Sequence, residues 1–189
     1  MSRGREKFQK FQGIISLVVK WYQLFPKKSR YRKLEKNRYT RGYIGQVKRY
    51  ALVKSIAKAV GDNVSIKEGV FLYNIDNLIL GSNVSIWPLV YIDAYGGLNI
   101  GSDVSIAHGV SILTFEHQYE NHEIPIKDQE VKALPVSIGN NVWIGAKATI
   151  LGGNSIDSGS VIGAGSVITK NVQCDSIVVG VPGRKVKDR

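Results

Sequence analysis

Residues 138–168 read IGNNVWIGAKATILGGNSIDSGSVIGAGSVI, and in this stretch an isoleucine returns at every sixth position. Two residues before several of these isoleucines stands another small or apolar side chain, as at Val142 and Ala148. Residues two apart on an extended strand face the same side, so each six-residue unit turns two side chains inward. A helical period of about 3.6 residues does not fit this spacing. The stretch therefore predicts short strands around an aliphatic core.

The same period runs through much of the chain before this stretch, and repeats of fixed length are the signature of a solenoid. About five coils of three units each fit between Val60 and Gln173. Glycine follows many of the aliphatic residues, where we expect it to turn a corner cheaply. The pattern predicts a parallel β-coil, and an ordinary β-sandwich is the alternative. The earlier aliphatic positions are Val60, Ile66, Leu72, Leu80, Ile86, Ile92, Ile100, Ile106 and Ile112, and the glycines are Gly61, Gly81, Gly101, Gly139, Gly145 and Gly163.

Four segments of the repeat region are distinctive: residues 114–117 (TFEH), 141–146 (NVWIGA), 163–170 (GAGSVITK) and 180–184 (GVPGR). Together they resemble the hexapeptide-repeat acyltransferases, in the branch of the maltose, galactoside, polysaccharide and xenobiotic O-acetyltransferases. That family folds as a left-handed parallel β-helix, a hand that the general preference for right-handed crossovers would not predict. The resemblance implies an all-β domain of about five coils over residues 60–187, preceded by a helical, basic extension over residues 1–59.

The six-residue period breaks between Ile112 and Ile138, where the spacing is 26 residues. We therefore expect an excursion loop at residues 113–135, and long loops in compact domains are often functional. The family's essential histidine stands at the start of this excursion, which implies that His117 is the general base. An imidazole with an ordinary pKa of about 6.5 is mostly neutral near pH 7 and accepts a hydroxyl proton. We expect His122 to pack in the loop or to lie at the substrate rim, and His108 to lie on a coil face.

In the family, the segments after the excursion line a groove between neighbouring subunits that holds acetyl-CoA, which implies a homotrimer with acetyl-CoA as co-substrate. Small residues let pantetheine lie against the coil, and Lys or Arg pair with phosphates. The chain departs from the family at Gly183, where alanine is usual. It also departs at Lys187, where some members have arginine. The implied donor-binding residues are Trp143, Ala146, Ala164, Thr169, Lys170, Arg184 and Lys187.

The segment 92–97 (IDAYGG) lies one coil before the histidine. Family members that acetylate sugars often carry an acidic or amide group here, which implies that Asp93 binds acceptor hydroxyls. A turn-capping role is the alternative. Trp87 is a candidate for stacking on a sugar ring, or else an aromatic residue on the solvent face.

The charge is divided unevenly along the chain. Residues 1–60 hold 17 Lys and Arg against two acids, a net charge of +15, whereas residues 61–189 hold nine against 13, a net charge of −4. Apolar residues recur at helical spacing near the N-terminus, a cationic stretch follows Pro26, and residues 47–59 read as a second amphipathic helix. This arm predicts either membrane-surface association through residues 1–41 or a helical cap over the first coil. The first apolar face comprises Phe8, Phe11, Ile15, Val18 and Tyr22, with Lys7, Lys10 and Lys20 around it.

Cysteine usage and the apolar runs bear on location. Cys174 is the one cysteine, so no intrachain disulfide forms and a reducing compartment is expected. The arm's longest apolar run is too short to cross a bilayer, and bulky residues follow it where a signal peptide would have a cleavage site. We expect a cytoplasmic protein, peripheral at the inner face of the cell membrane. We expect no nucleic-acid partner, because the arm has no DNA-reading motif.

The predicted function is acetyl transfer from acetyl-CoA to a sugar hydroxyl of a surface polysaccharide or its lipid-linked precursor. An antibiotic is the alternative acceptor. Two other classes share the fold. The first class is the γ-type carbonic anhydrases, which bind zinc through three histidines. His117 and His122 of this chain have a suitable spacing, but that family places its first histidine about two coils earlier, where this chain has none, so we expect no metal. A trimer with a purely structural role is disfavoured because the motif residues are intact.

Overall fold

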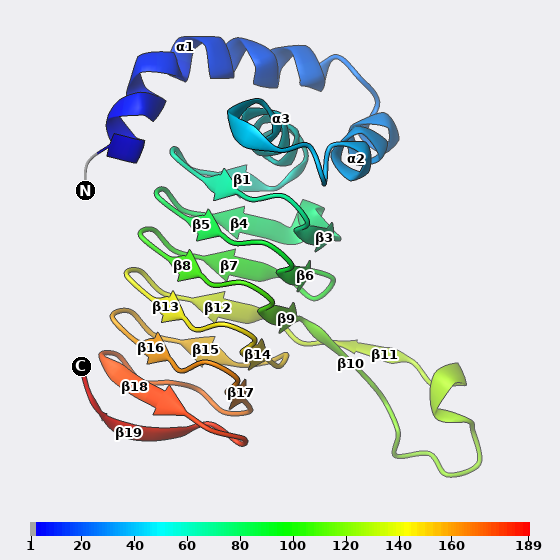
Figure 1. Cartoon of the computed structure of the whole chain (residues 1–189). Coiled ribbons are helices and arrows are strands. Elements are labelled where there is room, and N and C mark those ends of the chain that lie inside the picture. The colour runs from blue at the N-terminus through cyan, green and yellow to red at the C-terminus, as the bar shows by residue number, and fades with distance from the viewer. Residues whose placement is uncertain (1–2) are drawn as a thin grey trace.

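The computed structural model describes residues 3–189, apart from the side chains of residues 3–5 and Lys7. From Ala59 onward the chain winds into a three-sided prism whose faces are sheets of short parallel strands (Figure 1). The first face contains β1 (Ala59–Val60), β4 (Leu78–Leu80), β7 (Leu98–Ile100), β12 (Val136–Ile138) and β15 (Ser155–Ile156). The second contains β2 (Ser65–Ile66), β5 (Ser85–Ile86), β8 (Ser105–Ile106), β13 (Trp143–Ile144), β16 (Val161–Ile162), β18 (Ser176–Val179) and the antiparallel β19 (Arg184–Asp188). The third contains β3 (Phe71–Tyr73), β6 (Tyr91–Asp93), β9 (Ser111–Leu113), β14 (Thr149–Ile150) and β17 (Val167–Ile168).

The predicted aliphatic core is confirmed. Each coil contributes one strand to each face, which makes five complete coils. A sixth coil begins where Val172 bridges to Ile156 and β18 pairs with β16. Isoleucines in equivalent positions stack directly on one another, as in the pairing of Ile144 with Ile106 and Ile162. These three side chains are completely buried. The six-residue period is therefore the period of the core.

The corner glycines have a different physical reason from the one expected. They do not adopt the left-handed backbone; Asn63, Asn83, Asp103 and Asn141 adopt it instead, two residues further along the coils. What requires glycine is the close approach of neighbouring coils. A Cβ atom on Gly81, for example, would lie 2.5 Å from a backbone carbon of the next coil. The expectation that these glycines ease the turn itself is therefore wrong.

Three α-helices, α1 (Arg3–Gln23), α2 (Lys27–Lys36) and α3 (Gly42–Ile56), precede the prism and lie across its first coil (Figure 1). Helix α3 lies next to the coil, and both α1 and α2 pack against α3. Arg49 joins the layers: its guanidinium donates to the backbone carbonyls of Ile66 in the first coil and of Asn37 and Thr40 between α2 and α3. The helices thus form a cap on the open end of the prism.

The cap differs from the sequence expectation in two ways. Residues 27–36 form the helix α2, which the cationic pattern did not predict. Helix α3 begins five residues before the expected Val47, and its residues 49–53 are all buried, because the coil covers one side and α1 and α2 cover the other. An amphipathic pattern was the wrong criterion for a helix buried on both faces.

Candidate active site

The expected excursion is a β-hairpin that projects from the prism (Figure 1). Its strands are β10 (Phe115–His117) and β11 (Val131–Ala133), which pair antiparallel with His117 opposite Val131. The tip contains the short 3₁₀ helix η2 (Ile126–Asp128). Gln129 holds the tip together, because its side-chain amide donates to the carbonyls of Asn121 and Ile124, 2.8 Å away in each case. The hairpin is therefore an ordered arm.

The root of the hairpin is joined tightly to the second coil. The Thr114 hydroxyl is buried, donates to the carbonyl of Asp93 at 2.9 Å and accepts from the backbone N–H of Gly96 at 2.8 Å. Gly96 permits this contact, because a Cβ atom there would lie 2.1 Å from the carbonyl oxygen of Thr114. Leu113 of β9 pairs with Asp93 of β6, and His117 follows Leu113 by four residues.

Asp93 is nearly buried at the end of β6. One carboxylate oxygen, Oδ1, accepts hydrogen bonds from the Asn74 side chain at 2.7 Å and from the backbone N–H of Tyr95 at 3.1 Å. The bond from Tyr95 is the turn-capping contact considered as an alternative. The second oxygen has no hydrogen-bond donor among the described residues. Asp93 therefore caps its turn through one oxygen, while the other has no donor among the described residues.

Aromatic residues neighbour Asp93: Tyr73 lies opposite it across β3 and β6, and Tyr91 and Tyr95 stand two residues before and after it. Tyr91 and Tyr73 pack with ring centroids 5.3 Å apart, and Tyr95 meets Phe115 of the hairpin edge to face at 5.9 Å. Burial, with the nearby Asp93 charge, raises the pKa of Tyr91. Its phenol thus stays a neutral hydrogen-bond donor beside the carboxylate. Trp87 is not part of this group: it follows β5 at one corner of the coil, whereas Asp93 ends β6 at the next corner, and it lies half-exposed under Lys67.

The three histidines lie apart from one another in the chain's fold. His117 is exposed at the end of β10, and its imidazole makes no hydrogen bond to another described residue. His122 is exposed in the hairpin tip, and His108 is exposed at a corner of the third coil. Among residues 3–189, no cluster of three or more His, Cys, Asp or Glu side chains is arranged to hold a metal ion.

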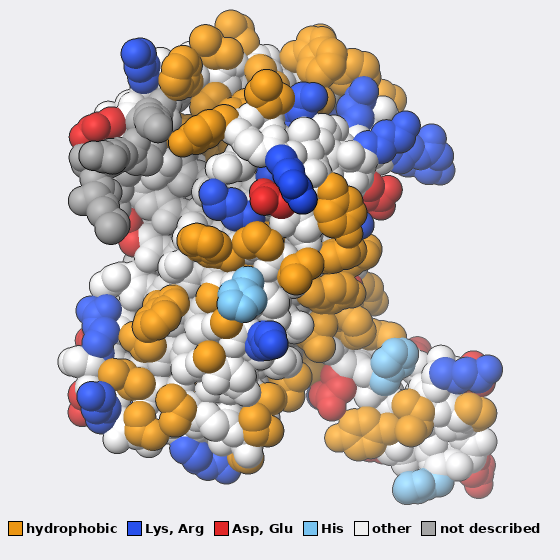
Figure 2. Space-filling model, in the orientation of Figure 1, with side chains coloured by type: hydrophobic (Ala, Val, Ile, Leu, Met, Phe, Trp, Pro, Cys, Tyr) orange, Lys and Arg blue, Asp and Glu red, His pale blue; other side chains and the backbone are white. Residues whose placement is uncertain are grey.

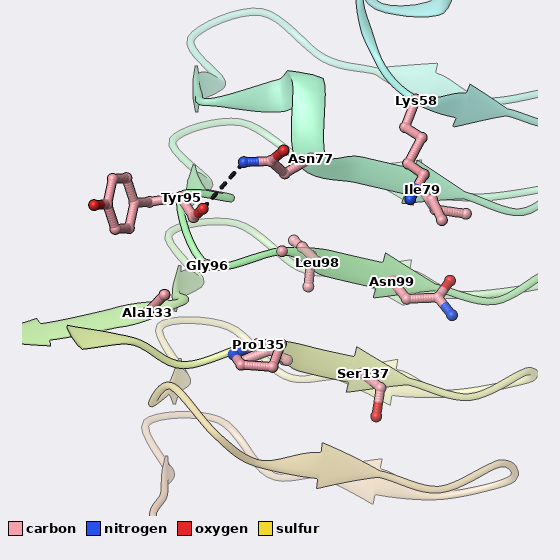
Figure 3. A pocket seen from close by; sticks show the side chains of 12 residues that line it. Lys58, Asn77, Ile79, Tyr95, Gly96, Leu98, Asn99, Ala133, Pro135 and Ser137 are labelled. Carbon is pink, nitrogen blue, oxygen red and sulfur yellow. Dashed lines mark hydrogen bonds between the residues drawn. The ribbon is translucent and has the colours of Figure 1, made fainter.

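A shallow groove of about 590 Å³ follows the first face of the prism beside the hairpin root (Figure 3). Its floor is the outward side of β4, β7 and β12, where Ile79, Asn99 and Ser137 lie in register. Lys58 closes one end, and Ala133 and Pro135 of the returning hairpin strand form the other wall. The sequence does not predict this groove, because outward positions carry no repeat signal. It does not include His117, Asp93 or Trp87.

The structure brings together the corners that carry Ala146 and Ala164. The carbonyl of Ala146 accepts from Gly165 at 2.8 Å, and a Cβ atom on Gly145 would lie 2.6 Å from the nitrogen of Ala164. Neither alanine's backbone N–H donates to another described residue. Trp143 lies on the strand that leads into this pair and is 56% exposed. The two corners thus form a strip whose alanine N–H groups have no acceptor among the described residues, with the exposed Trp143 three residues before Ala146.

The basic residues predicted for the donor lie near the C-terminal end of the prism, opposite the helical cap. Thr169 and Lys170 follow β17, and Arg184 begins β19 directly after Gly183, which bonds to Val167 of β17. Lys187 lies further along β19, opposite Ile177. Lys185, which the sequence analysis did not select, lines the same hollow as Lys170. Nothing in the sequence singles out Lys185, because both faces of β19 carry charged residues.

Comparison with known proteins gives consistent relatives. Residues 135–170 match the family described as bacterial transferase hexapeptide (six repeats). The galactoside O-acetyltransferase of Escherichia coli K12 is 35% identical over 141 residues, 75% of this chain and 68% of that protein. A solved galactoside acetyltransferase in complex with coenzyme A is 27% identical, with a TM-score of 0.76 over 90% of this chain and 82% of that one. A maltose O-acetyltransferase from Clostridium difficile 630 is 25% identical, with a TM-score of 0.71 over 91% and 88%. The likeness confirms the predicted left-handed β-helix fold.

Proposed function

Because the chain belongs to the hexapeptide-repeat transferases of the galactoside and maltose O-acetyltransferase type, we propose that it acetylates a sugar hydroxyl with acetyl-CoA as donor. The proposed acceptor is a surface polysaccharide or its lipid-linked precursor. The observation that supports acceptor binding best is the free oxygen of Asp93, held among aromatic rings at the root of the arm that carries His117. Carboxylates and aromatic rings are the groups that bind sugar hydroxyls and the apolar faces of sugar rings.

In the proposed reaction, the acceptor oxygen attacks the thioester carbonyl of acetyl-CoA in a ternary complex. The imidazole of His117 removes the hydroxyl proton as the new C–O bond forms. The C–S bond then breaks, and the departing sulfur takes the proton from the imidazolium. Cys174 lies in the last coil, away from the hairpin, so no acyl-cysteine intermediate is part of the proposal.

The strip between Ala146 and Ala164 is the proposed donor site. Its free backbone N–H groups suit the pantetheine amides, and the N–H near Ala146 is the proposed donor to the oxyanion. Trp143 would cover the pantetheine arm. Basic side chains near the end of the prism would pair with the phosphates. Those side chains are Lys170, Arg184 and Lys187, with Thr169 beside them. The structure adds Lys185, which lines the same hollow as Lys170.

The proposed assembly is a homotrimer. In a single chain, no described residue holds the His117 imidazole, and the hairpin strands carry no buried side chain. A projecting arm of this kind completes a site only when a neighbouring copy lies against it. Light scattering should therefore give about three times the chain mass of 20.9 kDa. A monomer that turns over sugar acceptors would contradict the shared site.

The first experiment is titration of the purified protein with acetyl-CoA by calorimetry, followed by a coenzyme A release assay with sugar and antibiotic acceptors. We expect one donor site per chain and turnover with sugars. His117→Ala should abolish turnover and retain acetyl-CoA binding. His122→Ala, which removes an exposed histidine from the same hairpin, is the matched control. Equal turnover by His117→Ala would refute the general-base assignment, and turnover with antibiotics alone would replace the acceptor.

The sugar assignment is tested separately by Asp93→Asn. The amide retains the acceptor for Asn74 and the Tyr95 backbone but cannot offer a charged oxygen to the substrate. We expect a higher KM for the sugar with little change in acetyl-CoA affinity. Trp87→Ala should have a smaller effect on this KM, because Trp87 lies at a different corner of the coil.

A further inference from the structure

Helix α1 carries apolar side chains on two neighbouring faces. One face packs against α3 through Ile15, Val19 and Tyr22, which are buried. The other face, here called the outer face of α1, has no cover among the described residues. It consists of Phe11, Ile14, Leu17 and Trp21 of α1 and of Leu24 directly after the helix, which are 49%, 62%, 67%, 51% and 80% exposed. Packing of the cap leaves about half or more of each of these five side chains exposed.

The part of the chain that carries the outer face is strongly basic. Residues 3–36 hold eleven Lys and Arg against two acids. Figure 2 shows hydrophobic and basic side chains gathered at the helical end of the molecule. Lys27 forms an ion pair with Asp76 of the prism, which fixes the start of α2 beside the coil. The exposed basic residues nearest in the chain are Lys10 and Lys20 on α1 and Lys28, Arg32 and Lys36 on α2.

We propose that the outer face of α1 docks this protein on the surface of an anionic phospholipid bilayer, with α1 lying parallel to the surface. Interfacial helices bury their apolar side chains roughly 5–10 Å into the headgroup region, and lysines beside them bind acidic lipids. No helix within residues 3–189 is long and apolar enough to cross a membrane, so the association is peripheral.

Charge distinguishes the bilayer from the other candidate, a second copy of this chain. Two copies that met through their outer faces would bring two strongly basic surfaces together, and like charges across an interface oppose association. An acidic lipid surface has the complementary sign and an extended shape that the exposed side chains of one helix contact together. The observations therefore favour lipid.

The outer face is preformed. Phe8 packs edge to face on Tyr50 of α3 at 5.6 Å, and Trp21 packs against Phe25 at 4.9 Å, with Lys33 over the Phe25 ring. Docking therefore orders no new helix, and less conformational entropy is lost than when a disordered segment folds on a membrane. The proposal does not depend on the catalytic assignment, but it would bring the enzyme to a lipid-linked acceptor.

The test is sedimentation of the full chain with phosphatidylcholine vesicles, with and without phosphatidylserine. We expect binding to the phosphatidylserine vesicles alone. The double variant Leu17→Gln, Leu24→Gln should bind at least about tenfold more weakly, because two exposed leucines lose their transfer into lipid. Leu89→Gln is the matched control: it makes the same change at a leucine 61% exposed on the second coil, and it should bind like the wild type.

Circular dichroism and acetyl-CoA titration show whether the variants remain folded, independently of lipid and of any acceptor. Trp21 gives a second readout, since brominated lipid should quench its fluorescence, and Trp21→Phe should remove that quenching. Three results would overturn the proposal: no vesicle binding by the wild type, equal binding with and without phosphatidylserine, or unchanged binding by the folded double variant. Dissociation of the oligomer in the double variant, with no vesicle binding by the wild type, would instead assign the face to contact between copies.

Discussion

Replacing Arg49 by leucine should detach the helical cap from the prism. The guanidinium is 1% exposed and donates to the carbonyls of Ile66 at 2.9 Å, of Asn37 at 2.9 Å and of Thr40 at 2.7 Å. Burial lowers the pKa of Arg49, and Glu68, 3.9 Å from Nη2, offsets part of that shift. The side chain therefore replaces lost hydration with these three short hydrogen bonds and a longer one to the Arg38 carbonyl at 3.4 Å, which together join α2, α3 and the first coil.

The expected loss of stability follows from the carbonyls of Ile66, Asn37 and Thr40, which would lose their donor. A buried carbonyl left without a donor costs about 1–3 kcal/mol. The carbonyls of Asn37 and Thr40 are only partly buried, so the lower end applies, and leucine also removes the cost of a buried charge. We expect Arg49→Leu to lower the free energy of unfolding by about 3 kcal/mol. Arg49→Lys retains one donor group, so its free energy of unfolding should lie between those of Arg49→Leu and the wild type.

The assay is urea unfolding followed by circular dichroism, with acetyl-CoA titration of the folded variant as a second readout. The midpoint should fall while acetyl-CoA affinity is retained, because the donor strip lies in later coils. Arg32→Leu, at an exposed arginine of α2, is the control and should change stability by no more than about 0.5 kcal/mol. A loss below about 1 kcal/mol for Arg49→Leu, or an equal loss for the control, would refute the reasoning.

Three further predictions concern the site and the cap. His117→Asn should lower kcat by about 10²–10⁴-fold and leave the acetyl-CoA dissociation constant unchanged, and single-turnover kinetics would check this. Lys170→Ala and Lys185→Ala should each weaken acetyl-CoA binding about tenfold, with inhibition by the phosphate-free fragment pantetheine unaffected. Burial beside Asp76 raises the pKa of Tyr31 to about 12, and the neutral phenol donates to that carboxylate. Its contribution to stability is thus complete below about pH 10 and is lost as the pH rises through about 12, so Tyr31→Phe should flatten this alkaline decline in urea midpoint.

The repeat predicted the prism because a core period is a local property: every sixth residue faces inward whatever lies outside. The cap was harder to predict, since the burial of α3 depends on what covers each side of it. The corner glycines illustrate a similar limit. Their positions were correct, but Gly81 is required by contact with the next coil, which is not visible in one strand.

Only part of the candidate site could be predicted, again because contacts between coils are not visible in a local stretch of sequence. The resemblance selected His117 and the corners of Ala146 and Ala164 as motifs, and the structure brings those two corners together. It did not reveal that Thr114 attaches the hairpin to the coil of Asp93, because that contact joins residues 21 positions apart through a buried hydroxyl. Trp87 stands six residues before Asp93 in the sequence, but the two residues lie at different corners of the second coil.

The strands on either side of the hairpin remain in register across it: β7 pairs with β12, and β9 pairs with β14, as if the intervening residues were not present. The prism therefore does not depend on the length of the hairpin. Doubling a flexible loop costs only about 0.6 kcal/mol in closure entropy. Hairpins from related enzymes should be transferable between Thr114 and Leu134, which keeps the contacts of Thr114 with the second coil and would allow the acceptor preference to be re-engineered while the scaffold and its donor strip stay unchanged.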